Sequence, residues 1–362
     1  MNWVLIFLGF SALIILHEAG HFFAAKATGM RVERFFLFFP PKLVSVKRGE
    51  TEYGIGAIPA GGFVKISGMN PDEELPEGEE HRGYYRQPVW KRIVVIGAGP
   101  AVNIVLAFAI LFAVSLDARN ATQSVGEIIP GSPAAAALQP GDRIVAVDGR
   151  AYPTADLETR LTRFAGEVAS HRCPGKQVDG CRAATPVILR VRRDGQLSTI
   201  RVRPEYDAAI RRTRIGFSYG SEPANLSVGG AVDRSTGFMW LVTHKTLTVF
   251  ANIFDAEQRK QVSGIVGVSD VANQTIDIGA QESLILLAIV SLSLGLINLF
   301  PFLPLDGGHI FWSLVEKVRG RPVPFRVMER AGALGFVLVI MLFFIGLSND
   351  IGRITGDGFT VR

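Results

Sequence analysis

The chain has 362 residues, of which 48% are hydrophobic, and its mean hydropathy is +0.28. Only 20% of the residues are charged, against about a quarter in typical globular proteins. This composition excludes a disordered chain and a disulfide-rich scaffold, and it argues against an ordinary soluble enzyme. The net charge of +5 calls for no nucleic-acid partner, because a small basic excess is also expected in loops on one side of a membrane.

Four nearly uncharged segments have the length needed to cross a membrane, for which about 20 apolar residues suffice. They cover residues 3–25, 93–116, 283–305 and 331–348. The ionisable residues of the first segment are His17, Glu18 and His21. We expect this segment to be retained rather than cleaved as a secretory signal, because Met1 and Asn2 place no basic charge ahead of it.

The short loops between these segments are basic. Residues 31–92 contain ten Lys and Arg side chains, and residues 306–330 contain five. Basic short loops stay in the cytosol. We therefore expect a multi-pass protein of the inner (plasma) membrane, with both termini and residues 117–282 outside.

Residues 124–204 have the composition of one small β-rich domain. The string SPAAAALQPGDRIVAVDGR covers residues 132–150, and an alternating apolar and polar pattern on both sides of Asp194-Gly195 predicts a hairpin. This order resembles a PDZ domain of the bacterial, circularly permuted type. The resemblance implies binding of extended peptides along a sheet edge.

Two further features of the outer segment leave alternatives open. Cys173 and Cys181 are eight positions apart and would pair in an oxidising compartment, or they are two free thiols. Residues 205–282 are expected to form a linker that includes the apolar segment 238–254. That segment fits a helix lying on the membrane surface or an ordinary packed helix equally well.

The main functional signal is the motif HEAGH inside the first apolar segment. His17 and His21 are four positions apart, so both imidazoles share one face of a helix and can reach one tetrahedral Zn²⁺. Glu18 lies about 100° round the helix, where it can reach a water molecule on the metal. Ionisable groups at membrane depth are costly unless they serve a site or a polar cavity. The motif therefore predicts a catalytic zinc site.

Catalytic zinc needs a third protein ligand, and Asp306 is the candidate at matching depth. It follows the third apolar segment, where Asn298, Pro301 and Pro304 are expected to break the regular helix. The alternative is an Asp that only caps a helix at the membrane exit. His309 is a rival ligand, and it is better explained as a neighbour of the site because two His and one carboxylate already complete the set.

HEAGH, GPAVN at residues 99–103, the PDZ-like string and NLFPFLPLDGGH at residues 298–309 together resemble the site-2 protease family, in its bacterial sigma-factor-regulating branch with one PDZ domain. The family fold implies a polytopic α-helical membrane protein with four transmembrane helices and one extracytoplasmic β-rich PDZ domain. The expected segments are a first helix with HExxH at 1–30, a cytosolic loop with a membrane-associated β element at 31–92, a second helix at 93–116, the PDZ domain at 124–204, a linker with an interfacial helix at 205–282, a third helix with LDGG at 283–309 and a fourth at 331–348.

The resemblance implies an intramembrane zinc metalloendopeptidase that cuts transmembrane segments after a first extracytoplasmic cut. His17, His21 and Asp306 would bind zinc, and Glu18 would be the catalytic base. Expected partners are the lipid bilayer and single-span membrane proteins, such as anti-sigma factors or remnant signal peptides. A PDZ-bearing membrane scaffold and a zinc transporter are the alternatives. A scaffold has no use for Glu18 between two histidines, and four spans with one ligand cluster offer a transporter no evident path.

Overall fold

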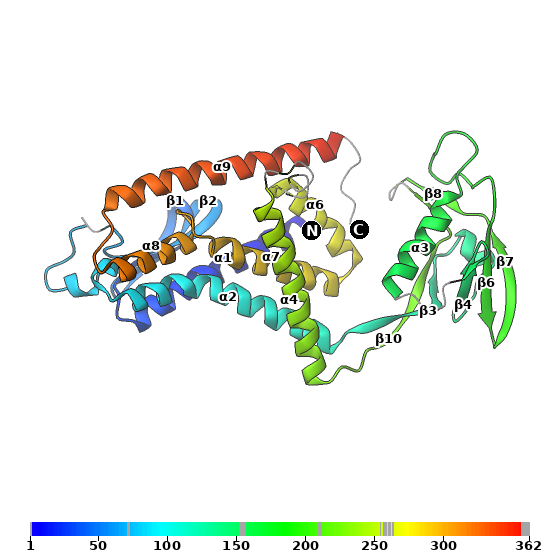
Figure 1. Ribbon diagram of the computed structural model, residues 1–362, viewed down its shortest axis with the longest axis horizontal. Helices are drawn as coiled ribbons and strands as arrows, with labels where there is room; N and C mark the ends of the chain where they lie inside the picture. Colours follow the sequence, from blue (N-terminus) through cyan, green and yellow to red (C-terminus); the bar gives the residue numbers. More distant parts are fainter. Residues whose placement is uncertain are drawn as a thin grey trace. The chain divides into compact units, whose positions relative to one another are not determined.

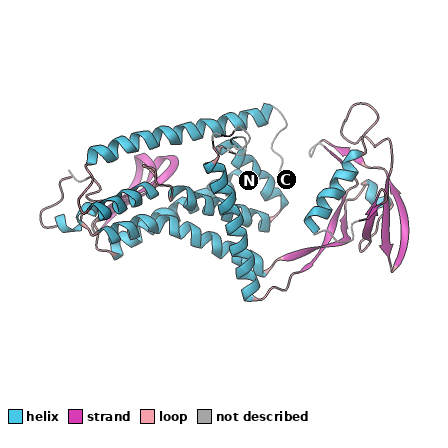
Figure 2. Ribbon diagram, viewed as in Figure 1, coloured by secondary structure: helices cyan, strands magenta, loops and turns pink. Residues whose placement is uncertain are grey.

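The structure is a computed structural model that describes residues 2–70, 73–151, 157–208, 212–253, 255, 259, 262 and 264–355. The chain divides into two compact units (Figures 1 and 2), one made of Met1–Leu116 with Ser227–Arg362 and the other of Asp117–Leu226. Within the described residues, four helices are long and apolar enough to cross a membrane. They are α1 (Asn2–Ala27), α2 (Val89–Leu116), α7 (Ala280–Asn298) and α9 (Phe325–Thr355).

Helix α2 is the centre of the helical unit, because α1 and α7 both pack along it (Figure 1). The crossing of α1 and α2 requires a small residue at Gly20, since a Cβ atom there would lie 2.6 Å from the carbonyl oxygen of Ala98. Small residues let membrane helices approach closely when lipid supplies no hydrophobic drive for association. This close approach brings HEAGH against α2.

The loop between α1 and α2 holds a long antiparallel hairpin of β1 (Val32–Arg48) and β2 (Thr51–Ile66). The loop expected to hold a β element at 31–92 therefore contains a two-stranded hairpin. The base of the hairpin shares a buried core with α1 and α2 through Phe22, Met30, Ile66 and Val95. Two short 3₁₀ turns, η1 (Glu80–Arg82) and η2 (Tyr84–Arg86), lead into α2.

The third apolar segment is not one helix through residue 309. Helix α7 ends at Asn298, residues 299–305 form an irregular loop, and α8 (Asp306–Arg319) begins at Asp306. The prediction that Asn298, Pro301 and Pro304 break the helix agrees with this geometry, whereas the boundary of 283–309 was wrong. The physical reason is that proline removes a backbone donor and clashes with the preceding turn.

An ion pair ties α8 to α2. The guanidinium of Arg92 donates two hydrogen bonds to the carboxylate of Glu316, at 3.0 and 2.6 Å, and its carbon lies 6.0 and 5.5 Å from the rings of Tyr84 and Tyr85. Arg92 is only 2% exposed. Removing one partner of such a buried pair strands a charge and costs about 3–5 kcal/mol.

Two further helices complete this unit. Helix α4 (Val228–Ala251) packs on α2 and α7, so the apolar segment 238–254 belongs to a packed helix through residue 251. Helix α6 (Ile265–Ile278) contacts α1, α7 and α9. The carboxylate of Asp350 on α9 accepts hydrogen bonds from the N–H groups of Gly264 and Gly267 at the start of α6. That contact fixes the end of α9 to α6.

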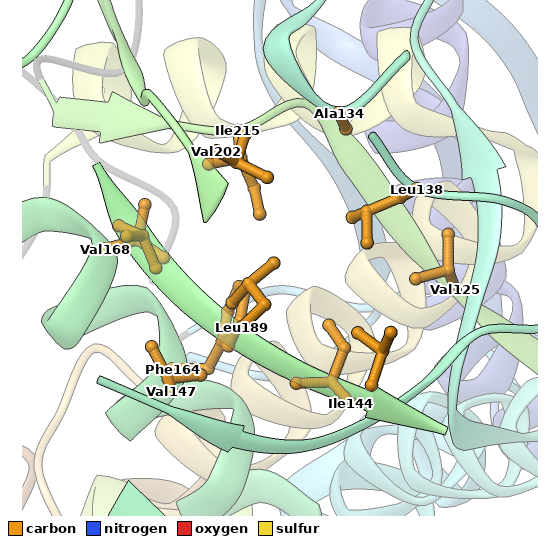
Figure 3. Close-up of a cluster of buried hydrophobic side chains, with 12 residues drawn as sticks. Val125, Ala134, Leu138, Ile144, Val147, Phe164, Val168, Leu189, Val202 and Ile215 are labelled. Atoms are coloured by element: carbon orange, nitrogen blue, oxygen red, sulfur yellow. The ribbon is translucent and has the colours of Figure 1, made fainter. Parts of the chain in front are cut away.

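The second unit is built around an antiparallel sheet with strands of unequal length. Their order is β10-β3-β4-β6-β7, with β5 (Arg150–Ala151) beside β4. The other strands are β3 (Arg119–Ile128), β4 (Arg143–Val147), β6 (Val187–Arg193), β7 (Gln196–Val202) and β10 (Phe217–Pro223). A 3₁₀ turn η3 (Pro133–Ala136) and helix α3 (Leu157–Ser170) contribute residues to its buried core. Figure 3 shows that core, with Leu189 and Val202 from the sheet facing Phe164 and Val168 from α3.

This unit extends beyond the boundary expected at residue 204. The predicted linker contains β8 (Glu205–Asp207), β9 (Arg212–Arg214) and β10, and β10 pairs with β3 at the start of the unit. A strand pairing of residues so far apart in sequence leaves no local pattern to read. Cys173 and Cys181 form a disulfide, which decides between the two alternatives left open above.

Candidate metal centre

Three side chains from two helices converge on one point. Nε2 of His17 and Nε2 of His21 lie 3.3 Å apart, and Oδ2 of Asp306 lies 3.2 Å from the first and 3.3 Å from the second. Both histidines are buried, and Asp306 is half-buried at the start of α8. Among the described residues, these three form the only group of His, Cys, Asp and Glu side chains arranged to hold a metal ion.

Nε2 of His17, Nε2 of His21 and Oδ2 of Asp306 form a triangle, called the ligand triangle below. Its sides match the distances between three ligands of a tetrahedral zinc ion. Ligands at about 2.0–2.1 Å from a tetrahedral metal lie about 3.3–3.4 Å from one another, which matches the three separations. Oδ2 of Asp306 is buried without a well-aligned hydrogen bond. Buried acceptors that point at a common centre repel unless a proton or a cation lies between them. The donor set, two imidazoles and one carboxylate, also suits zinc.

Helix α2 orients both imidazoles from behind. Nδ1 of His21 lies 2.9 Å from the carbonyl oxygen of Val95, and Nδ1 of His17 lies 3.2 Å from the side-chain amide of Asn103. A metal-binding imidazole usually donates its second N–H to an acceptor such as the Val95 carbonyl, which fixes the ring and leaves the other nitrogen for the metal. Asn103 is fully buried and contacts His17 through its amide nitrogen Nδ2, while its Oδ1 has no hydrogen-bond partner among the described residues. A half-turn of the amide places Oδ1 where it can accept the Nδ1–H of His17.

Gly99 makes room for one of these rings. A Cβ atom at Gly99 would lie 2.3 Å from Nε2 of His21, far inside van der Waals contact. Glycine at this position of GPAVN is therefore a condition for the histidine to occupy its place. In contrast, a Cβ at Gly97, two residues earlier on the same helix, would meet only the side chain of Ile310, at 3.9 Å.

Glu18 stands beside the triangle without joining it. It is half-buried on α1, and its carboxylate interacts with His21, His17 and Asp306 and with the main chain of Val64 on β2. Gly62 on the same strand approaches so closely that a Cβ there would lie 3.1 Å from Cγ of Glu18. The hairpin thus forms a wall beside this carboxylate.

The remaining histidines do not contribute to the triangle. His309 is half-buried on α8, and its ring does not join the group of ligand atoms. His171 belongs to the second unit, where it pairs with Asp148 at 2.9 Å. His81 and His244 lie in η1 and α4. The sequence reasoning missed the contacts of Asn103 and Gly99 with the histidines, although GPAVN was the visible signal.

The family described as peptidase family M50 matches residues 5–342. The zinc metalloprotease Rip1 of Mycolicibacterium smegmatis is 31% identical over 395 residues, which cover 95% of this chain and 93% of the relative. Rip1 of Mycobacterium tuberculosis is 29% identical, covering 94% and 91%. A predicted zinc metalloprotease of Clostridium perfringens is 30% identical, covering 95% and 96%.

The support given by α2 can be tested by metal retention. Gly99→Ala should displace the His21 ring and Asn103→Leu should release the His17 ring, and each is expected to weaken zinc binding by about 10–100-fold, as for other residues that orient metal ligands. Zinc content after graded chelator treatment, measured by mass spectrometry, checks this.

Gly97→Ala is the matched control for these variants, because its new methyl group would meet only the Ile310 side chain, at an ordinary contact distance of 3.9 Å. Equal zinc retention in all three variants and the unaltered protein would show that α2 does not support the metal site.

Proposed function

This chain belongs to peptidase family M50 and is a zinc metalloprotease, and we propose that it cuts peptide bonds inside the transmembrane segments of other membrane proteins. The observation that carries the proposal is the place of the ligand triangle. His17 and His21 lie on α1, a helix apolar enough to cross a membrane. A substrate bond must therefore reach the metal at membrane depth.

The residues have distinct proposed roles. His17, His21 and Asp306 hold the zinc ion. When bound, zinc acts as a Lewis acid that activates a water molecule and polarises the scissile carbonyl. Glu18 takes the proton from the attacking water and gives it to the leaving amine, as its position beside the triangle allows. Asn103 keeps the His17 ring oriented.

The substrate must unwind locally before it is cut. The carbonyl groups of an intact transmembrane helix are hydrogen-bonded within that helix and shielded by its side chains. A cleft of about 530 Å³ lies along β2, lined by Phe63, Val64, Met69 and neighbouring residues. Val64, which lines this cleft, also contacts Glu18 through its main chain, so we propose that the unwound segment binds along β2.

We propose the inner membrane as the location, with the metal centre toward the cytosol and the second unit and both termini outside. The basic loops 31–92 and 306–330 support this orientation. The disulfide Cys173–Cys181 supports it independently, since disulfides persist in oxidising compartments.

The second unit is proposed to be a PDZ domain that selects substrates. Its strand β10 is the terminal strand of the sheet, and Phe164 of α3 makes edge-to-face contacts with Phe217 and Tyr219 of β10, at 5.6 and 5.9 Å between ring centroids. A terminal strand flanked by a helix is the arrangement to which an extended peptide adds as a further strand. The proposed substrates are single-span proteins, such as anti-sigma factors or remnant signal peptides, that have lost their outer domain to a first protease.

Replacing the proposed base tests the mechanism. Glu18→Gln keeps the shape of the side chain and removes its ability to take a proton, so cleavage of a tagged single-span substrate should fall by at least about 100-fold. Zinc content should stay at one ion per chain, measured on the same sample. Cleavage that survives the change would overturn the role of Glu18, and loss of zinc would show a structural role instead.

Deleting the second unit tests substrate selection. If the unit excludes proteins whose outer domain is intact, a chain with residues 117–226 replaced by a short flexible linker should cut untrimmed substrates that the full chain leaves whole. Immunoblots of both substrate forms in the membrane fraction measure this. Loss of cleavage for trimmed and untrimmed substrates alike, with zinc retained, would indicate recruitment instead of exclusion.

A further inference from the structure

We propose that one face of the second unit docks on anionic phospholipid headgroups. This surface, the arginine face, consists of the outward positions of β4, β6 and β7 and carries Arg143, Arg190, Arg192 and Arg201, all exposed. Inward positions of the same strands, such as Leu189 and Val191, are fully buried in the core. The alternation therefore places the four guanidinium groups on one side of the sheet.

Within the part of the unit that the structure describes, no carboxylate forms an ion pair with this face. The three strands contain 19 residues and not one Asp or Glu. Among the described residues, Arg190, Arg192 and Arg201 form no ion pair, and Arg143 donates its hydrogen bonds to the neutral amide of Gln123. The fifth arginine of these strands, Arg193, pairs instead with the buried carboxylate of Asp142 at 2.6 Å.

The placement of these arginines lowers the stability of the sheet, and the fold itself gives no reason for it. Arg143 and Arg192 lie directly opposite each other on neighbouring strands, and like charges in that position destabilise a sheet. Charged residues often protect the exposed edge of a sheet from aggregation. Arg190 and Arg192, however, lie on β6, which is flanked on both sides by β4 and β7. Edge protection accounts for Arg201 on β7 and leaves the two on β6 unexplained.

The positions at which the chain enters and leaves the second unit favour a lipid surface as the partner of the arginine face. The unit begins at Asp117, directly after α2 ends at Leu116, and it ends at Leu226, two residues before α4 begins at Val228. Since α2 is apolar enough to cross a membrane, the unit is tethered beside a bilayer without a long linker. Such tethering gives a weak surface contact a high effective concentration.

The apolar residues of the same face fit this occupant as well. Leu197 is 52% exposed and lies opposite Arg192, and Ile188 is 38% exposed and lies opposite Arg201. Guanidinium groups bind phosphate oxygens in a bidentate manner, and apolar side chains between them can enter the headgroup boundary. An acidic protein is the other polyanion that such a face could bind, and it would not require the unit to lie near lipid.

The test measures how close the arginine face lies to the lipid surface in the full chain. Leu197→Cys provides a single free thiol, because Cys173 and Cys181 are paired. A nitroxide spin label is attached to this thiol, and its spin relaxation rate is measured in nanodiscs that contain a nickel-chelating lipid, whose paramagnetic ion speeds the relaxation of a nearby label. The nanodiscs consist of phosphatidylcholine alone or of phosphatidylcholine mixed with phosphatidylglycerol. The label should relax faster in the anionic nanodiscs. The difference should shrink as salt is raised, since screening shortens from about 30 Å at 0.01 M to about 3 Å at 1 M.

Paired variants decide whether the arginines cause the contact. Arg190→Gln with Arg192→Gln should lower the ratio of docked to undocked states by about 30-fold, at about fivefold for each lost charge. Lys176→Gln with Arg182→Gln removes two charges from the exposed disulfide-bonded loop and its border and should leave the ratio unchanged. Equal relaxation in both kinds of nanodisc, or equal effects of the two double variants, would overturn the proposal.

Discussion

The structure depends on one constraint: three acceptor atoms from two helices, α1 and α8, meet at one point. Nε2 of His17, Nε2 of His21 and Oδ2 of Asp306 lie within 3.3 Å of one another, and such a cluster is stable at membrane depth only around a cation or a proton. A zinc ion held by these three atoms would therefore be part of the folded helical unit. Metal binding to this kind of site also contributes to the stability of the fold.

The surroundings of the triangle follow from that requirement. Small residues at Gly20 and Gly99 let α2 approach the histidines, and α2 then supplies a carbonyl oxygen and an amide to their outer nitrogens. The third proposed ligand, Asp306, begins a separate short helix, α8, and the ion pair between Arg92 and Glu316 joins that helix to α2. Helix α2 thus contacts every element that contributes a ligand, and the hairpin places its own main chain beside Glu18.

The sequence was most informative where a local pattern carries the geometry. The spacing of His17 and His21 and the length of the apolar segments are properties of single helices, so four helices of spanning length and the shared histidine face could be predicted. Asp306 was found because few carboxylates lie at that depth, and the structure places it with the histidines. The family itself was recognisable from the order of the motifs.

Features that depend on contacts between distant segments were not readable. The pairing of β10 with β3 joins the two ends of the second unit. Three strands therefore lie in the segment 205–282, which was predicted to be a linker. The start of α8 at Asp306 reflects a loop whose prolines predict a break without predicting where the next helix begins. The roles of Asn103 and Gly99 require knowledge of how α1 and α2 cross. The arginines of β6 appeared only as part of a hairpin until the sheet placed them on one face.

X-ray absorption at the zinc edge of the purified full chain tests the central claim most directly. The structure predicts one zinc per chain with nitrogen and oxygen ligands at about 2.0–2.1 Å and the scattering pattern of two imidazoles. In Asp306→Ala, the remaining zinc should show one protein oxygen fewer or be lost. A sulfur ligand at about 2.3 Å, a single imidazole, or an identical spectrum and zinc content in Asp306→Ala would contradict the account.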